Sequence, residues 1–144
     1  MEECIQLIKQ TPVWRESHHI SLRIPEKIGC WGDSQQLKRV LINLIHNACA
    51  SFDDNQEGEI RITALESAEK DTDEKTIIKI TDNGPGIPEE IIDKIFNPFF
   101  TTRKSGTGLG LAIVHQIIDS HRGDVRVVSR KNEGTTFEIS LPLP

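Results

Sequence analysis

The chain has 144 residues, of which 36% are hydrophobic and 27% charged, and this size and composition fit one globular domain and exclude a disordered tail. It has no apolar run near the ~20 residues that a membrane-spanning helix needs, and its net charge of -5 gives no general attraction to nucleic acid. Its three cysteines are far apart and form no C-x-x-C pair, which argues against disulfides and a zinc site and predicts a reducing, cytoplasmic compartment.

Two short elements are predicted at the start of the chain. Residues 3–10 have the pattern of a helix that Pro12 ends. Residues 18–24 have the pattern of a strand that Pro25 ends.

The clearest predicted element is a helix over residues 34–52. Asp33 is a suitable N-cap, with Gln36 three residues later. Apolar residues follow at helical spacing: Leu37, Val40, Leu41, Leu44, Ile45, Ala48 and Phe52. Asn43 and Asn47 lie one turn apart at the edge of this apolar face. Their amides could bind a hard cation and phosphate oxygens, or both could be solvated.

Residues 58–67 and 75–82 are predicted to be neighbouring strands of a hairpin, joined by a polar, exposed turn. The second strand ends at Asp82 in the stretch DNGPGIP, which is ordinary turn chemistry. An aspartate at the end of an apolar strand would also be partly buried and would need donors, such as a purine amine. Gly84 and Gly86 would let a flat ring approach the backbone. The residues alone leave a turn and a binding site equally open.

The second half of the chain completes the predicted fold. Residues 88–96 are predicted to form a short helix, and residues 97–108 a flexible polar loop. Residues 108–121 are predicted to form an almost wholly apolar and therefore buried helix, followed by strands at 124–130 and 134–143. We expect an α+β two-layer sandwich, with about three helices on one face of a mixed, mostly antiparallel sheet of about five strands.

Five of the ten glycines fall within residues 84–110, where even spacing at ordinary usage would place roughly two. Three of them stand in GTGLGLA at the start of the predicted helix 108–121, where bare backbone N–H groups and the helix dipole favour an anion. Arg103 and Lys104 precede them and favour phosphate. The spacing matches neither a Walker loop nor a dinucleotide fingerprint.

Four motifs occur together: NLIHNA (43–48), DNGPGIP (82–88), NPFFTTR (97–103) and GTGLGLAIVHQIIDSHRG (106–123). In this order and spacing they resemble the catalytic and ATP-binding domain of bacterial sensor histidine kinases. That domain has the Bergerat fold, shared with gyrase, heat-shock chaperone and mismatch-repair ATPases. The resemblance implies that residues 16–144 are the catalytic domain and that residues 1–15 are a linker helix from an upstream dimerisation and phosphoacceptor region.

The resemblance implies ATP and Mg2+ as cofactors and a role for each matching residue. Asn47 would bind the magnesium, Asp82 would accept a hydrogen bond from the adenine amine, and Phe96, Phe99 and Phe100 would lead into a mobile lid. Asn43, Asn47 and Arg103 are assigned to catalysis. The predicted nucleotide-binding residues are Asn43, Asn47, Asp82, Gly84, Gly86, Ile87, Phe99, Thr101, Thr102, Arg103, Lys104, Gly106, Thr107, Gly108, Leu109, Gly110, Leu111 and Thr135.

The sequence departs from the family's pattern in two places. Many members carry a lysine and an aromatic residue where this chain has Ala50 and Ser51, so phosphate contact would rest more on Arg103, Lys104 and the helix start. No acceptor-histidine motif is visible, because Ile-Ser-Leu-Arg follows the two histidines at 18 and 19. We expect all five histidines to have structural or surface roles: His18, His19, His46, His115 and His121.

The resemblance implies an enzyme domain that donates the γ-phosphoryl group of Mg-ATP to a histidine on a separate dimerisation domain, with a response regulator as indirect partner. It would work in the cytoplasm or in the cytoplasmic part of a membrane-bound sensor, and would not phosphorylate itself. Three alternatives stay open: a related ATPase, a serine kinase of the anti-sigma type, and a nucleotide-sensing module without transfer. The ATPase relatives carry a water-activating glutamate where this chain has Asn43.

Overall fold

Five strands form one mixed sheet in the computed structural model, which describes residues 1–67 and 74–144. They are β1 (His18–Arg23), β2 (Gly58–Ser67), β3 (Lys75–Asp82), β4 (Asp124–Arg130) and β5 (Gly134–Pro142). Their order across the sheet is β1-β2-β3-β5-β4. β1 is parallel to β2, which requires a crossover connection, and the other neighbours are antiparallel.

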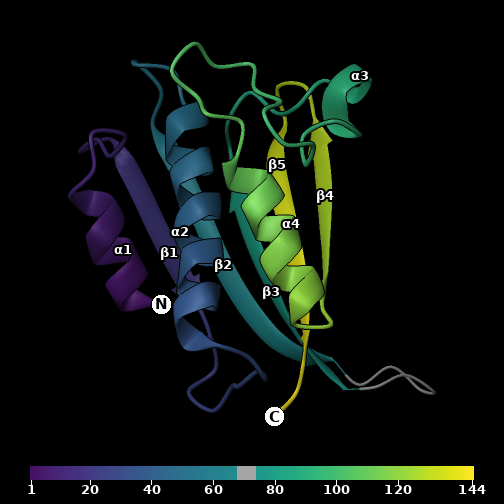
Figure 1. The fold of residues 1–144 in the computed structure, drawn as a ribbon. Helices are drawn as coiled ribbons and strands as arrows, with labels where there is room; N and C mark the ends of the chain where they lie inside the picture. Colours follow the sequence, from purple (N-terminus) through teal and green to yellow (C-terminus); the bar gives the residue numbers. More distant parts are fainter. Residues whose placement is uncertain (68–73) are drawn as a thin grey trace.

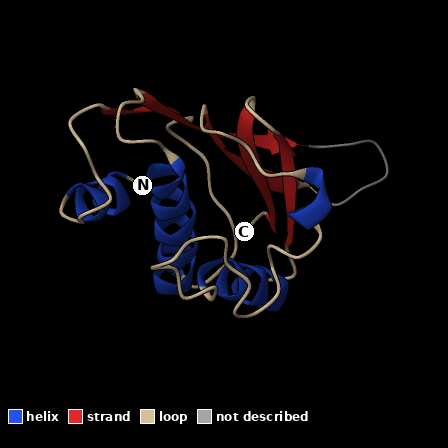
Figure 2. Ribbon diagram, turned by 90° about the horizontal axis from the view of Figure 1, so that it is seen from above, coloured by secondary structure: helices blue, strands red, loops and turns tan. Residues whose placement is uncertain are grey.

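Four helices accompany the sheet in the described part of the chain: α1 (Glu2–Lys9), α2 (Ser34–Ser51), α3 (Glu89–Ile92) and α4 (Gly110–Ser120). α1, α2 and α4 cover one face of the sheet, while the short α3 lies near β4 (Figures 1 and 2). Within residues 1–67 and 74–144, no helix has the length and apolarity needed to cross a bilayer. The predicted α+β two-layer sandwich is confirmed.

The predicted boundaries agree with the structure to within two residues, except in one helix. The prediction of a helix over 88–96 is wrong in length, because α3 ends at Ile92. The chain continues in tight turns, in which Lys94 N donates to the Ile91 carbonyl and Asn97 N to the Lys94 carbonyl. Pro98 also disfavours a helical conformation at Asn97. The predicted turn between β2 and β3 falls on residues 68–73 and lies outside the described residues.

The prediction that the almost wholly apolar helix 108–121 is buried holds for one side of the helix only. Val114, Ile117 and Ile118 of α4 are buried, whereas His115 and Gln116 are exposed. Only one side of α4 packs against α2 and the sheet. The opposite side lies in solvent, although the sequence of the helix is almost wholly apolar.

The core lies between the sheet and the helices. Side chains alternate between the two faces of a strand, so Ile60, Ile62 and Ile80 point from β2 and β3 toward the helices and are buried. α2 supplies the largest helical share: Val40, Leu44, Ile45, Ala48 and Cys49. α1 joins the same core through Ile5 and Ile8. The assignment of residues 1–15 to an upstream linker stays a prediction.

His121 joins the end of α4 to the start of α2. Its Nε2 accepts a hydrogen bond from the backbone N–H of Asp33 at 2.9 Å, and its Nδ1 lies 2.7 Å from the Ile117 carbonyl oxygen. The Asp33 side chain accepts from the backbone N–H of Gln36 at 2.8 Å and so caps α2, as predicted. α2 and α4 therefore run antiparallel, and the start of α4 lies beside the second half of α2 (Figure 1).

Candidate functional site

Asp82 ends β3 and is almost fully buried, with 8% of its surface exposed. Its Oδ1 accepts a hydrogen bond from the backbone N–H of Gly84 at 2.8 Å. Burial raises the pKa of this carboxyl, against the opposing effect of backbone hydrogen bonds from Gly84 and Thr135 and of the positive charge of Arg103. The backbone thus holds the carboxyl in place as a hydrogen-bond acceptor.

Protein atoms occupy the space that side chains would need at Gly84 and Gly86. A Cβ added to Gly84 would lie 2.7 Å from Ser51 Oγ and 2.9 Å from Asp82 Oδ1. Gly86 has a φ of +74°, and a Cβ there would overlap the carbonyl group of Arg130. Packing beside Asp82 therefore requires Gly84, and packing beside Arg130 requires Gly86. Contact of their backbone with a flat ring stays a prediction.

A hydroxyl network joins the loop after β3 to the β4–β5 hairpin. Ser129 Oγ accepts from the backbone N–H of Ile87 at 2.8 Å and donates to the Gly134 carbonyl oxygen at 3.0 Å. It also lies 2.8 Å from Oγ1 of the buried Thr135. Thr135 and Ile87 were predicted as site residues, but Ser129 was missed. The hairpin register, which pairs Ser129 with Thr135, was the signal that could have found it.

Arg103 connects the predicted lid to α2 by a hydrogen bond. Its Nη2 donates to the backbone carbonyl oxygen of Asn47 at 2.9 Å. Burial lowers the pKa of the guanidinium, and the nearby Asp82 carboxylate opposes this effect. A role for Arg103 at the phosphates stays a prediction, and its contact with the backbone of α2 was not predicted from the sequence.

The start of α4 faces Asn43 on α2. A Cβ added to Gly110 would lie 3.5 Å from Asn43 Oδ1, so the two helices approach closely here. The first backbone N–H groups of a helix have no partner within the helix, and no side chain caps those of α4. Together with the helix dipole, this helix start favours an anion beside the Asn43 amide.

The residues of the predicted lid, the loop over 97–108, are mostly exposed and contact one another. Phe99 is 75% exposed with a φ of 66°, and its N–H donates to the Gly108 carbonyl oxygen at 2.9 Å. Thr101 Oγ1 accepts from the N–H of Arg103 at 3.1 Å. The other exposed lid residues among those predicted are Thr102, Lys104, Gly106 and Thr107. Their contacts with a nucleotide, like those of Leu109 and Leu111, stay predictions.

Comparison with known proteins identifies the family. The family of histidine kinase-, DNA gyrase B- and HSP90-like ATPases matches residues 32–144. The chain belongs to this family. It is 39% identical over 143 residues to the signal transduction histidine-protein kinase AtoS of Escherichia coli K12, covering 99% of this chain and 22% of AtoS. It is 43% identical over 112 residues to sporulation kinase A of Bacillus subtilis 168, covering 77% of this chain and 17% of that kinase.

Solved structures agree with this assignment. The catalytic domain of histidine kinase ThkA is 33% identical, with a TM-score of 0.79, over 99% of this chain and 91% of that one. The mycobacterial sensor histidine kinase MprB is 28% identical, with a TM-score of 0.78, over 98% of this chain and 90% of that one. The chain corresponds to the catalytic ATPase domain of histidine kinases, as the motifs predicted, and spans about a fifth of the length of the curated relatives.

Asp82→Asn is expected to stabilise the ligand-free protein at neutral pH. Burial raises the pKa of Asp82, so folding favours the protonated form of this carboxyl. The group therefore contributes most to stability below its pKa in the unfolded chain. That contribution is lost as the pH rises through its pKa in the folded protein. An amide oxygen can still accept from Gly84 and carries no charge. Guanidinium unfolding at pH 7 should give a higher midpoint for Asp82→Asn. The exposed Asp93→Asn should change stability by less than about 0.5 kcal/mol, and a lower midpoint for Asp82→Asn would contradict this explanation.

Proposed function

We propose that this domain binds Mg-ATP along the second half of α2 and donates its γ-phosphoryl group to a histidine on a separate dimerisation domain, in two-component signalling. The supporting observation is that Asp82 and the uncapped start of α4 both lie beside α2. The Asp82 carboxylate suits a nucleotide base, and the start of α4 suits phosphates. Asn43 faces this helix start and Asn47 lies one turn later on α2.

Asp82 would recognise the adenine base of ATP. A buried carboxylate accepts hydrogen bonds and cannot donate them, so it suits the 6-amine of adenine. Guanine presents a carbonyl oxygen at the same position, and two acceptors would face each other without a hydrogen. The same carboxylate therefore predicts discrimination against GTP.

The phosphate end would combine the start of α4 with the amides of Asn43 and Asn47. An amide oxygen is a suitable ligand for Mg2+, and within the described residues no cluster of three or more His, Cys, Asp or Glu side chains could hold a metal alone. Asn47 would therefore share the ion with phosphate and water. Bound Mg2+ would neutralise charge on the phosphates and orient them. Lys104 is exposed and could turn toward the phosphates.

Transfer would need few reactive groups on this chain. The acceptor histidine nitrogen attacks the γ-phosphorus, the bond to the β–γ bridging oxygen breaks, and ADP leaves with that oxygen. Catalysis is then positioning and charge stabilisation, which the start of α4 and Arg103 can provide. Asn43 is neutral and cannot take a proton from water, so the structure supports transfer over the ATPase alternative.

Asp82→Asn should weaken Mg-ATP binding roughly 10- to 150-fold, because a lost charged hydrogen bond costs ~1.5–3 kcal/mol. Isothermal titration calorimetry measures this directly. Asp93→Asn, which changes an exposed carboxylate at the end of α3, serves as the matched control and should bind normally. An unchanged affinity in Asp82→Asn would refute the adenine assignment.

The chain alone should not accept phosphate from γ-labelled Mg-ATP. His18 and His121 are buried and His121 is engaged in hydrogen bonds, while the exposed His19 and His115 stand in no acceptor-histidine motif. We expect no acid-labile, base-stable label after incubation, as measured by gel autoradiography. Such label on this chain would contradict the transfer proposal. Steady release of inorganic phosphate that Asn43→Ala abolishes would favour an ATPase instead.

A further inference from the structure

Three aromatic side chains in contact with one another connect the segment between α1 and β1 to the end of α2. We call Trp14, His18 and Phe52 the aromatic row. The ring centroids of Trp14 and His18 are 5.5 Å apart and the rings meet edge to face, and those of His18 and Phe52 are 5.1 Å apart. His18 and Phe52 are 2% and 5% exposed. Such ring pairs add to the stability that burial alone supplies.

Phe52, the last ring of the aromatic row, contacts the backbone that forms a hydrogen bond with Asp82. A Cβ added to Gly84 would lie 3.6 Å from Phe52 Cδ1, so the ring lies directly against Gly84. The N–H of Gly84 in turn donates to the Asp82 carboxylate. Gly58 leaves room for the row, because a Cβ there would overlap the Phe52 ring and lie 2.9 Å from His18 Cδ2. A continuous chain of contacts therefore links Trp14 to Asp82.

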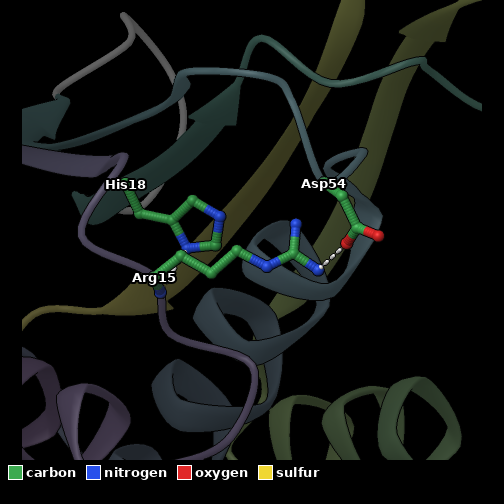
Figure 3. A network of polar contacts seen from close by, with 3 residues as sticks. All are labelled: Arg15, His18 and Asp54. Carbon is green, nitrogen blue, oxygen red and sulfur yellow. Dashed lines mark hydrogen bonds and ion pairs between the residues drawn. The ribbon is translucent and has the colours of Figure 1, made fainter.

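The middle of the row is fixed by polar contacts (Figure 3). His18 Nδ1 accepts from the backbone N–H of Arg15 at 3.2 Å, and Arg15 forms an ion pair with Asp54, just beyond the end of α2, at 2.5 Å. Arg15 Nη1 and His18 Nε2 are buried without hydrogen-bond partners. Burial and the charges of Arg15 and His19 lower the pKa of His18. The ring is therefore held neutral between two aromatic neighbours.

We propose that the aromatic row positions Gly84, and through it Asp82, for adenine, so that adenine binding is transmitted to Trp14 in the segment that precedes β1. This inference rests on the proposed function. Phe52 and His18 are positioning residues, since they would act on adenine only through Gly84 and Asp82. Ser51 Oγ also lies against Gly84 but carries no ring, so the aromatic contact with this backbone comes from Phe52.

Tryptophan fluorescence tests the transmission. The chain has two tryptophans, and Trp31→Phe leaves Trp14 as the single reporter; Trp31 is 56% exposed and packs near His121, far from the row. Adenosine and Mg-ATP should change Trp14 emission with the same half-saturation that calorimetry gives. Inorganic tripolyphosphate, which lacks the base, should leave the emission unchanged.

Variants of the row test positioning. In the Trp31→Phe background, His18→Ala and Phe52→Leu should weaken adenosine binding roughly 2- to 30-fold and abolish the emission change. His18→Phe keeps an aromatic ring and removes the unpartnered nitrogen, so it should restore both. Phe137→Leu, a buried β5 ring outside the row, should lower stability to a similar degree and leave adenosine affinity unchanged.

The possible outcomes separate the inference from the function on which it rests. Adenosine binding by calorimetry with constant Trp14 emission would overturn the inference and leave the proposed function intact. An equal response to tripolyphosphate, or loss of affinity in Phe137→Leu equal to that in Phe52→Leu, would also overturn it. Failure of the unaltered chain to bind Mg-ATP or adenosine at all would overturn the proposed function, and the inference with it.

Discussion

The Asp82 carboxylate is buried at the end of β3, and a buried charge needs hydrogen-bond donors or an opposite charge around it. The backbone N–H of Gly84, the backbone of Thr135 and the guanidinium of Arg103 meet this need. Two of these interactions restrict the residues around Asp82. Gly84 has to remain without a side chain, and Arg103 has to extend from the lid to α2. Much of the domain around the site can be understood as the surroundings that this one charge requires.

The antiparallel pairing of α2 and α4 decides where the site opens. At one end, His121 binds the backbone of Asp33 and closes the gap between the helices. At the other end, Gly110 approaches Asn43 with no cap on the first turn of α4. The same pair of helices is thus closed by hydrogen bonds at one end, and at the other end, where we propose that the phosphates bind, the start of α4 has no side-chain cap. A helix start without a cap is a cost to stability that an anion can offset.

Local chemistry predicted much of this arrangement. Asp33 was identifiable as a cap because its side chain acts within three residues, and Asp82 because a carboxylate at the end of an apolar strand needs donors. The contact of Arg103 with Asn47 joins residues 56 positions apart, and no local pattern encodes it. Ser129 was missed because its contacts depend on the register of the β4–β5 hairpin and on Ile87, which is 42 positions away. The exposed side of α4 depends on how few elements pack against it, which composition does not specify.

The central claim is that two glycine-rich segments serve the two ends of one nucleotide. Titration of 15N-labelled protein, followed by the backbone amide signals of Gly84 and Gly110, tests it most directly. Adenosine should move the signal of Gly84 and leave that of Gly110, and magnesium tripolyphosphate should do the reverse. Mg-ATP should move both with a single dissociation constant. Two different dissociation constants for Mg-ATP, or a signal at either glycine that stays in place, would contradict the claim.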